Sequence, residues 1–245
     1  MVISVKNFVI HKANNRGLSD YLWFQARHTF NFGHYNSNDP DKVRFGSLRV
    51  LNDGIVQGGK GFGAHPHENM EIITIPLEGA IEHKDSMGNT SIIKKGDVQV
   101  MSAGTGVMHS EYNISKVDTL KLLQIWIYPD KKNVKPRYQQ VALVAEDRKN
   151  KLQQILSPSY TDEGVWIYQR AWFFMGILDA GRKVVHRMKK NGNGVYVFVI
   201  RGSVSIADQK LDTRDGIGIW NTEGIILTSN IQETEVLVME VPMNM

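Results

Sequence analysis

The sequence predicts an all-β protein built from two similar halves. Most of the chain consists of short runs rich in valine, isoleucine and aromatic residues, separated by turn-forming glycine, asparagine and aspartate. Closely spaced strands of this kind are typical of β-sandwiches and β-barrels. Segments of the first half also recur in the second half, which indicates a duplicated β-domain.

The predicted strands follow one another along the chain. The clearest apolar runs are residues 43–51, 70–77, 90–95, 97–101, 120–128, 195–200 and 203–207. Turn signals separate several of them: Asn52-Asp53-Gly54, Met87-Gly88-Asn89 and Asn191-Gly192-Asn193-Gly194. One segment, AEDRKNKLQQIL at 145–156, is instead rich in helix-forming residues, so we expect a short helix there.

The two halves resemble each other in two places. LEGAIEH is similar to IRGSVSIA, which matches Gly79 with Gly202. KKGDVQVM is similar to TRDGIGIW, which matches Gly96 with Asp215. The expected divisions are an N-terminal domain over 1–128, a connector with a short helix over 129–164, and a C-terminal domain over 165–245.

The composition narrows the possible chemistry. The 245 residues are 42% hydrophobic and 22% charged, which is enough apolar material for a buried core. The absence of cysteine excludes disulfides and thiolate metal sites, so histidine and carboxylate remain as metal ligands. The formal net charge of +4 is too small to indicate direct binding of nucleic acid. Basic clusters at 131–137 and 182–190 are interpreted as solvated loops.

The sequence also bears on the location of the protein. Every apolar run is shorter than the roughly 18 residues that a membrane-spanning helix needs. Lys6 interrupts the first apolar run, and no small-residue cleavage site follows it, so this segment does not resemble a signal peptide. We therefore expect a cytoplasmic protein that does not enter a membrane.

A pattern typical of metal ligands occurs in GFGAHPHENMEI. Side chains alternate along a β-strand, so His65 and His67 are expected to share one face. Pro66 lacks an N–H and places this segment at the start of a strand or along a sheet edge. The spacing recurs in SAGTGVMHSEYN, where His109 and Glu111 again lie two residues apart after a glycine-rich turn.

Together the two pairs offer three imidazoles and one carboxylate. This set suits one divalent ion of iron, nickel, copper, manganese or zinc, and an octahedral ion would keep two positions open for substrate or O₂. Glu71 has the same strand parity and is an alternative to Glu111 as the fourth ligand. Three isolated histidines are interpreted as surface residues or hydrogen-bonded core residues: His11, His83 and His186.

These motifs resemble those of the cupin superfamily. The pattern G-x5-H-x-H-x3-E from Gly59, followed by Gly79, is similar to the first cupin motif, with its last glycine displaced by one residue. The pattern G-x5-S-x-G from Gly96, followed by H-x3-N from His109, is similar to the second, with serine in place of proline and one extra residue before the histidine. HPHENMEIITIPLEGAIEHKDSMGN, KKGDVQVMSAGTGVMHSE and the N-terminal RHTFNFGHY resemble, more narrowly, the pirin family.

The resemblance implies a bicupin, two tandem jelly-roll β-barrels with a short helical connector. In pirins the N-terminal cupin holds iron or another divalent ion through its H-x-H and H-x-E pairs. The ligands implied here are His65, His67, His109 and Glu111, with Fe(II) as the first expectation for the metal. Glu71 would then lie behind the ligands and orient a histidine.

The C-terminal domain is expected to be a degenerate cupin. The matched segments place Met188 over His65, Lys190 over His67, Thr228 over His109 and Asn230 over Glu111. None of the four replacements is a good ligand, so we expect no metal in this domain. His28 and His34 match family positions without an evident chemical role and are expected to be structural.

The function implied by the resemblance is a quercetin 2,3-dioxygenase-like oxidoreductase that opens a flavonol with O₂. Glu111, with Glu71 as the alternative, would accept the flavonol proton, and the open metal positions would take the deprotonated substrate. Candidate walls for its aromatic rings are Phe62, Met70 and Met108. The alternative function is a metal- or redox-sensing regulatory protein that binds a protein partner, with 182–190 as a candidate contact.

Overall fold

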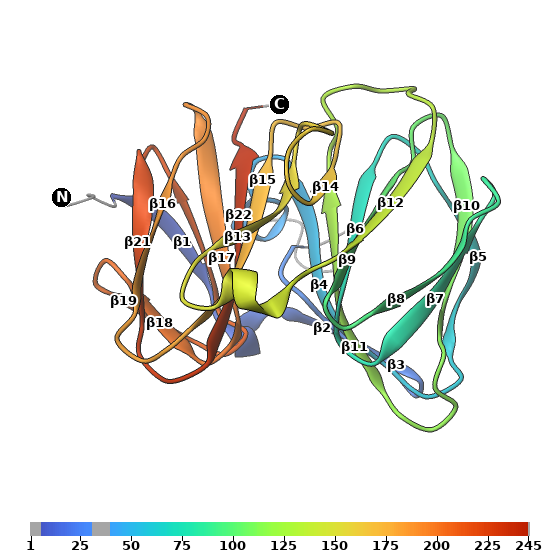
Figure 1. The fold of residues 1–245 in the computed structure, drawn as a ribbon, viewed down its shortest axis with the longest axis horizontal. Helices are drawn as coiled ribbons and strands as arrows, with labels where there is room; N and C mark the ends of the chain where they lie inside the picture. Colours follow the sequence, from blue (N-terminus) through green and yellow to red (C-terminus); the bar gives the residue numbers. More distant parts are fainter. Residues whose placement is uncertain (1–5, 31–39, 245) are drawn as a thin grey trace.

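The computed structural model describes residues 6–30 and 40–244. These residues form two β-domains side by side, each with one seven-stranded and one four-stranded sheet (Figure 1). The predicted all-β fold with two jelly-roll units is confirmed. No helix within the two described ranges is both long and apolar enough to span a bilayer.

The first domain contains the strands with the predicted ligands. The order in its large sheet is β12 (Arg137–Ala142), β9 (Asp97–Ser102), β6 (Glu71–Glu78), β11 (Leu120–Ile127), β4 (Leu48–Val56), β3 (Phe24–His28) and β2 (Gly17–Tyr21). The order in its small sheet is β5 (Gly61–His67), β10 (Val107–Asn113), β7 (Ala80–Asp85) and β8 (Thr90–Lys94).

The second domain repeats this plan. The order in its large sheet is β1 (Asn7–His11), β20 (Gly216–Trp220), β17 (Asn193–Arg201), β22 (Thr234–Pro242), β15 (Trp172–Leu178), β13 (Gln153–Ser157) and β14 (Val165–Trp166). The order in its small sheet is β16 (Lys183–Arg187), β21 (Gly224–Ser229), β18 (Ser203–Ile206) and β19 (Gln209–Asp212). The described helices are single 3₁₀ turns: η1 (Ala13–Asn15), η2 (Pro40–Lys42) and η3 (Ala145–Arg148).

The two large sheets face each other across a shared apolar core. Alternate residues of β6 and β11, such as Ile73 and Ile125, pack in one cluster with Phe173 of β15 and Leu237 of β22. All four of these residues are fully buried. The small sheets therefore lie at the two outer ends of the molecule (Figure 1), and the predicted ligands lie far from the junction between the domains.

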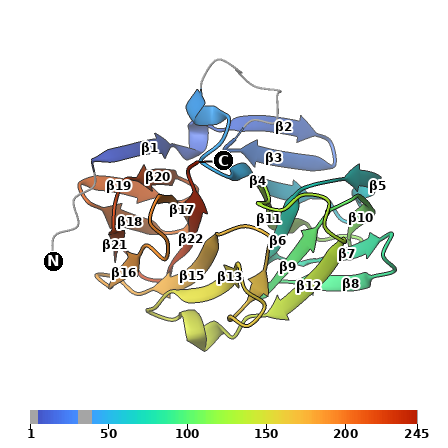
Figure 2. The ribbon, with the colours of Figure 1, turned by 90° about the horizontal axis from the view of Figure 1, so that it is seen from above.

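Strands near the domain borders tie the two halves together. β1, from the segment expected in the N-terminal domain, pairs with β20 of the C-terminal sheet, where Figure 2 shows it. β12, from the expected connector, pairs with β9 of the N-terminal sheet. β13, also from that connector, pairs with β15. The segment 129–164 thus supplies strands to both large sheets.

The helix predicted for 145–156 is wrong over most of its length. Only Ala145–Arg148 forms a 3₁₀ turn, and β13 begins at Gln153. Ile155 and Leu156 are fully buried in the core between the large sheets. Burial of these two side chains outweighs the helix propensity of the segment, since propensity differences per residue are below about 1 kcal/mol.

The strand predicted for 43–51 is also displaced. β4 spans Leu48–Val56 and continues through Asn52-Asp53-Gly54, which we expected to form a turn. This triplet pairs with β3 on one side and β11 on the other. A Cβ at Gly54 would lie 3.4 Å from the ring of Phe24, an ordinary contact distance, so the glycine does not interrupt the strand.

The turns of the two domains confirm the duplication and correct one match. Gly79 and Gly202 both precede the equivalent strands β7 and β18 and both have positive φ, at 77° and 97°. The second pair of matched segments shares a hydrogen bond. The amide of Lys94 donates to Asp97 in the first domain, and the amide of Asp212 donates to Asp215 in the second. Asp215 is therefore the counterpart of Asp97, and the counterpart of Gly96 is Arg214, which also has positive φ.

Two histidines expected to be structural have different outcomes. His28 hydrogen-bonds to the Asn52 side chain at 2.7 Å and to the Ser19 hydroxyl at 2.8 Å, within the large N-terminal sheet. These bonds account for its position in the fold. His34 lies outside the described residues.

Candidate metal centre

The strands β5 and β10 place the two ligand pairs next to each other. β5 is the terminal strand of the small sheet, as the proline in its ligand pair predicts, and it pairs only with β10 in that sheet. His65 lies directly opposite His109, and His67 lies opposite Val107. The two histidine-bearing segments, more than 40 residues apart in the chain, therefore meet on one face of the sheet.

An irregularity in β5 helps to orient these histidines. From His109 to Glu111 β10 advances by two residues, whereas β5 advances by three between His65 and Phe62, which leaves one extra residue in β5. Bulges of this kind bend a strand and re-aim its side chains. The Nδ1 of His65 lies 2.8 Å from the Gly63 carbonyl, which can only accept, so Nδ1 carries the proton and Nε2 keeps its lone pair.

Three imidazoles converge at this point. Ligand nitrogens of His65, His67 and His109 all lie within 4.8 Å of one another. The ring centroids of His65 and His109 are 4.3 Å apart, and those of His67 and His109 are 4.9 Å apart. Facing imidazoles at such separations can reach a common ion with metal–nitrogen distances of about 2.0–2.2 Å.

The environment disfavours protonation of two of these imidazoles. Burial lowers the pKa of His67 to about 4, with a further contribution from His65. Burial also lowers the pKa of His109 to about 2, with contributions from the neighbouring histidines. Nε2 of His109 is buried and, in the described part of the chain, has no hydrogen-bond partner. A buried nitrogen without a partner, beside two further imidazoles, fits a metal ion.

Glu111 lies two residues from His109 on β10, opposite Phe62 of β5 and His83 of β7. Its carboxylate is fully buried and forms a second group within 4.8 Å with His109 and His83. The Gln124 side-chain amide donates to one oxygen at 2.8 Å, and the Thr74 hydroxyl lies 3.5 Å from the other. Burial raises the pKa of Glu111, and the Gln124 bond opposes that shift.

His83 is a site residue that sequence reasoning missed. One of its two expected surroundings, a hydrogen-bonded core position, is confirmed, but that position is next to His109, which the sequence does not predict. Its Nε2 lies 3.0 Å from Asp85 Oδ2, and its Nδ1 lies 3.5 Å from His109 Nδ1. The signal in the sequence was the spacing of His83 and Asp85, two residues apart like the other pairs.

Glu71 lies elsewhere. It shares a face of β6 with Ile73, which packs in the core between the large sheets. Its carboxyl accepts a 2.6 Å bond from Ser102, and Arg137 donates to the same hydroxyl. Burial raises the pKa of Glu71 to about 8. The parity that made it an alternative ligand does not carry over, because β5 and β6 belong to different sheets.

Aromatic side chains line the ligand side of the small sheet. The ring centroids of Trp126 and His67 are 4.9 Å apart, and those of Phe62 and His65 are 6.5 Å apart. Phe62 also contacts Trp23 and Phe24, edge to face. Of the three expected walls, Phe62 therefore lies beside the histidines.

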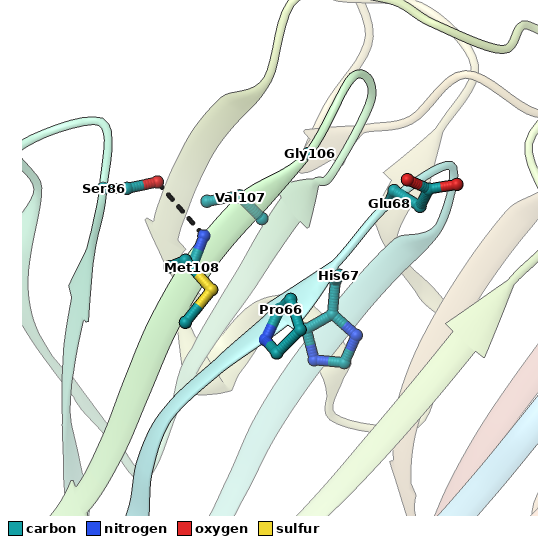
Figure 3. A pocket seen from close by; sticks show the side chains of 7 residues that line it. All are labelled: Pro66, His67, Glu68, Ser86, Gly106, Val107 and Met108. Carbon is teal, nitrogen blue, oxygen red and sulfur yellow. Dashed lines mark hydrogen bonds between the residues drawn. The ribbon is translucent and has the colours of Figure 1, made fainter.

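The other two expected walls have different surroundings. Met70 is nearly buried in a cluster that includes Trp126. Met108 projects from the opposite face, 43% exposed beside Pro66, and its amide donates to Ser86 (Figure 3). A depression of about 450 Å³ on that outer face reaches the histidine cluster only through His67. Met108 is consequently not a wall of the ligand side.

Strand registers identify the equivalent positions in the second domain. Glu111 pairs with His83 on β7, and Leu227 pairs with Ile206 at the matching position of β18. Leu227 is thus the counterpart of Glu111, and Ile225 that of His109. Ile225 pairs with His186, as His109 pairs with His65.

These registers correct the expected matches. His186, not Met188, occupies the place of His65, and Met188 occupies that of His67. Ile225 and Leu227 stand where we expected Thr228 and Asn230. The connection from Met188 to Gly194 is two residues longer than the equivalent one from His67 to Glu71, and the turn before β21 is two residues shorter than the turn before β10. These length differences account for the shift.

The comparisons with known proteins agree with this architecture. A family model described as Pirin matches residues 10–127, and one described as Quercetinase C-terminal cupin domain matches residues 154–241. A protein named quercetin 2,3-dioxygenase from Escherichia coli is 40% identical over 233 residues, 95% of this chain and 98% of that protein. A pirin-like protein from Caulobacter vibrioides is 35% identical over 225 residues, 91% of this chain and 95% of that protein.

Solved structures give the same result. The crystal structure of the bacterial pirin YhhW from Escherichia coli in complex with nickel(II) has a TM-score of 0.89 and 38% sequence identity, and the match covers 96% of this chain and 99% of that one. A further crystal structure of YhhW has a TM-score of 0.90. With identities of this size over nearly the whole length, the chain belongs to the pirin family.

Proposed function

We propose that this protein is a metal-dependent dioxygenase that opens the central ring of a flavonol such as quercetin with O₂. One observation carries the proposal: three imidazoles from two adjacent strands face one another beside a buried carboxylate, and burial lowers the pKa of two of them. The name of the Escherichia coli relative, quercetin 2,3-dioxygenase, and the nickel(II) complex of YhhW support it.

In this proposal His65, His67 and His109 hold one divalent metal ion, and Glu111 completes the set. The first three already form one group, and Glu111 joins them through His109. A bound divalent ion supplies Lewis acidity and, when redox-active, electron transfer toward O₂. Three neutral ligands and one anion leave such an ion with net positive charge, which favours an anionic flavonolate.

Glu111 has a second role as the proton acceptor for the flavonol 3-hydroxyl. Its two oxygens are oriented by Gln124 and Thr74, and Gln124 is itself fixed by the Trp126 indole N–H at 3.3 Å. A carboxylate held in this way loses little freedom when it accepts a proton. Positioned bases of this kind contribute about 10²–10⁴-fold to a rate.

The apolar rings of the substrate would contact the aromatic residues on the ligand side. Phe62 and Trp126 flank His65 and His67, and Trp23 extends the wall behind Phe62. Edge-to-face contacts with such rings contribute roughly 0.5–1.5 kcal/mol each beyond the burial of area. They favour a flat aromatic substrate over a sugar or an amino acid.

The test is oxygen uptake with quercetin after reconstitution with Fe(II), Ni(II), Cu(II) or Mn(II). We expect metal-dependent O₂ consumption together with loss of the flavonol absorbance, and none in a His109→Ala variant treated identically. Uptake at the protein-free background with every metal would remove the enzymatic proposal. A partner-binding role would then be examined by comparing the Fe(II) and Fe(III) forms.

A further inference from the structure

A string of buried polar side chains runs away from the metal site behind His109. His83, on β7, lies between His109 and Asp85, and all three side chains are shielded from solvent. The distances are 3.5 Å from His109 Nδ1 to His83 Nδ1 and 3.0 Å from His83 Nε2 to Asp85 Oδ2. The function proposed above uses neither His83 nor Asp85.

Asp85 is fixed at the far end by the turn that follows β7. Its Oδ1 accepts the amides of Met87 at 2.9 Å and Asn89 at 3.1 Å. The side-chain amide of Asn89 donates to both oxygens, at 3.0 and 2.8 Å. Because both oxygens accept N–H groups, the side chain acts as a carboxylate. Nε2 of His83 must therefore be the donor in the remaining contact.

This assignment determines the protons along the string. A neutral imidazole has one N–H, so a His83 ring protonated at Nε2 can only accept at Nδ1. The facing Nδ1 of His109 must then donate. His109 is left with its lone pair on Nε2, which is the buried nitrogen that lacks a hydrogen-bond partner within the described ranges.

We propose that His83 is a positioning residue of the metal centre: anchored by Asp85, it accepts the Nδ1–H of His109 and so directs the Nε2 lone pair of His109 to the metal. The inference rests on the metal centre proposed above and is independent of the flavonol chemistry. Groups that orient a metal-bound histidine typically change metal affinity by about 10–100-fold.

Two of the three histidines of the site are thus oriented by different means. His65 donates to a carbonyl of its own strand, at Gly63, and needs no other side chain. His109 depends on a side chain from the neighbouring strand β7. A role for His83 as a ligand conflicts with its contacts, because Nε2 is engaged by Asp85 and Nδ1 by His109.

The test compares Ni(II) affinity, by competition with a chelator, in the wild type and two variants. His83→Leu removes the acceptor, and we expect binding about 10–100-fold weaker with one Ni(II) still bound per chain at saturation. His83→Asn places its Oδ1 near the position of the lost Nδ1, and we expect it to recover most of the affinity. A purely structural role would not distinguish the two variants in this way.

His186→Leu is the matched control. His186 belongs to the C-terminal domain, where it is likewise buried and bonds to a carboxylate, that of Glu240. Its Ni(II) affinity should equal that of the wild type. Far-UV circular dichroism establishes that each variant is folded. If His83→Leu does not fold, Asp85→Asn takes its place, with a smaller loss expected because an amide oxygen can still accept from His83.

The outcomes separate the proposals. Wild-type affinity in folded His83→Leu, or in its substitute Asp85→Asn, would overturn the positioning role. Loss of stoichiometric Ni(II) in both His83 variants would overturn it in favour of a direct ligand. Absence of Ni(II) binding in the wild type would instead reject the metal centre, and the inference with it.

Discussion

The two domains share one strand order but differ at the position of the metal centre. In the first, four polar groups meet on the inner face of the small sheet; in the second, Ile225 and Leu227 replace two of them. Only the place of His65 keeps its residue type, as His186. The β-framework can therefore be maintained by either a polar or an apolar filling, and the identity of a few inward positions decides which domain can do chemistry.

The retained histidine of the second domain shows how such a position is closed. His186 Nε2 lies 2.9 Å from Glu240, which occupies the strand position of Trp126 in the first domain. The Glu240 carboxylate also accepts the amides of Lys189 and Lys190 and the side chain of Asn193. With four donors satisfied, this carboxylate has little remaining capacity for a ligand.

The largest effect is expected at the matched pair His109 and Ile225. His109→Ala should abolish stoichiometric metal binding and leave the fold intact, since the core is formed by apolar strand faces. Ile225→Ala should retain the metal and lower the free energy of unfolding by about 2–5 kcal/mol, as for other buried truncations. Elemental analysis and urea unfolding measure the two effects. Full metal content in His109→Ala would contradict the ligand assignment.

The next effect concerns the two buried carboxylates, Glu111 and Glu240. Glu111→Gln should reduce flavonol turnover at least 10²-fold, through weaker metal binding and loss of the proton acceptor. Glu240→Gln should leave turnover per bound metal unchanged, although it weakens the hydrogen bonds around His186. Steady-state oxygen uptake with metal content measured in parallel separates the contributions. Equal losses in both variants would indicate a structural effect only.

The third effect is a pH dependence at Glu71, whose counterpart in the second domain is Gly194. Burial raises the Glu71 pKa to about 8, so the neutral carboxyl is favoured in the folded state. The stability that this confers is present below the unfolded pKa of about 4.3 and is lost as the pH rises towards 8. Glu71→Gln stays neutral, so its stability relative to the wild type should rise across this interval.

The expected gain for Glu71→Gln is on the order of a few kcal/mol, since one pKa unit corresponds to about 1.36 kcal/mol. Urea unfolding at about pH 5 and about pH 8 measures it. Metal content should stay at the wild-type value, because the carboxyl lies with Ser102 between the large sheets. A constant stability difference across the interval would show that Glu71 is ionised in the folded state throughout.

The smallest effect on the metal is expected at His186. His186→Leu should leave one metal per chain and lower the free energy of unfolding by roughly 1–3 kcal/mol, because Glu240 loses one of its four donors. A stoichiometry of two metals in the wild type that falls to one in this variant would show that the second domain also binds metal.

Short-range patterns in the sequence predicted most of the strands and the meeting of His65, His67 and His109. Alternation of side chains and the lack of an N–H at Pro66 are local properties, so they can be read without the fold. Burial between sheets is not local. For this reason the segment 145–156, where a helix is expected, begins with a 3₁₀ turn and ends in a strand around the buried Ile155.

The errors at the site have the same origin. The position of Glu71 depends on which sheet β6 joins. The role of His83 depends on the pairing of its strand, β7, with β10. The mismatch of Met188 with His65 depends on the connection between β16 and β17, which is two residues longer than the one between β5 and β6. Each of these requires the register between strands that are distant in sequence.

The position of β5 at the end of its sheet has a consequence for assembly. A terminal strand leaves backbone donors and acceptors available to a strand from another molecule, which is a common route to aggregation. Pro66 removes one donor from this edge, and the irregularity between Phe62 and His65 interrupts the regular spacing of the others. The features that aim the imidazoles inward thus also hinder the stacking of copies, and a change that straightens β5 would threaten colloidal stability together with the metal centre.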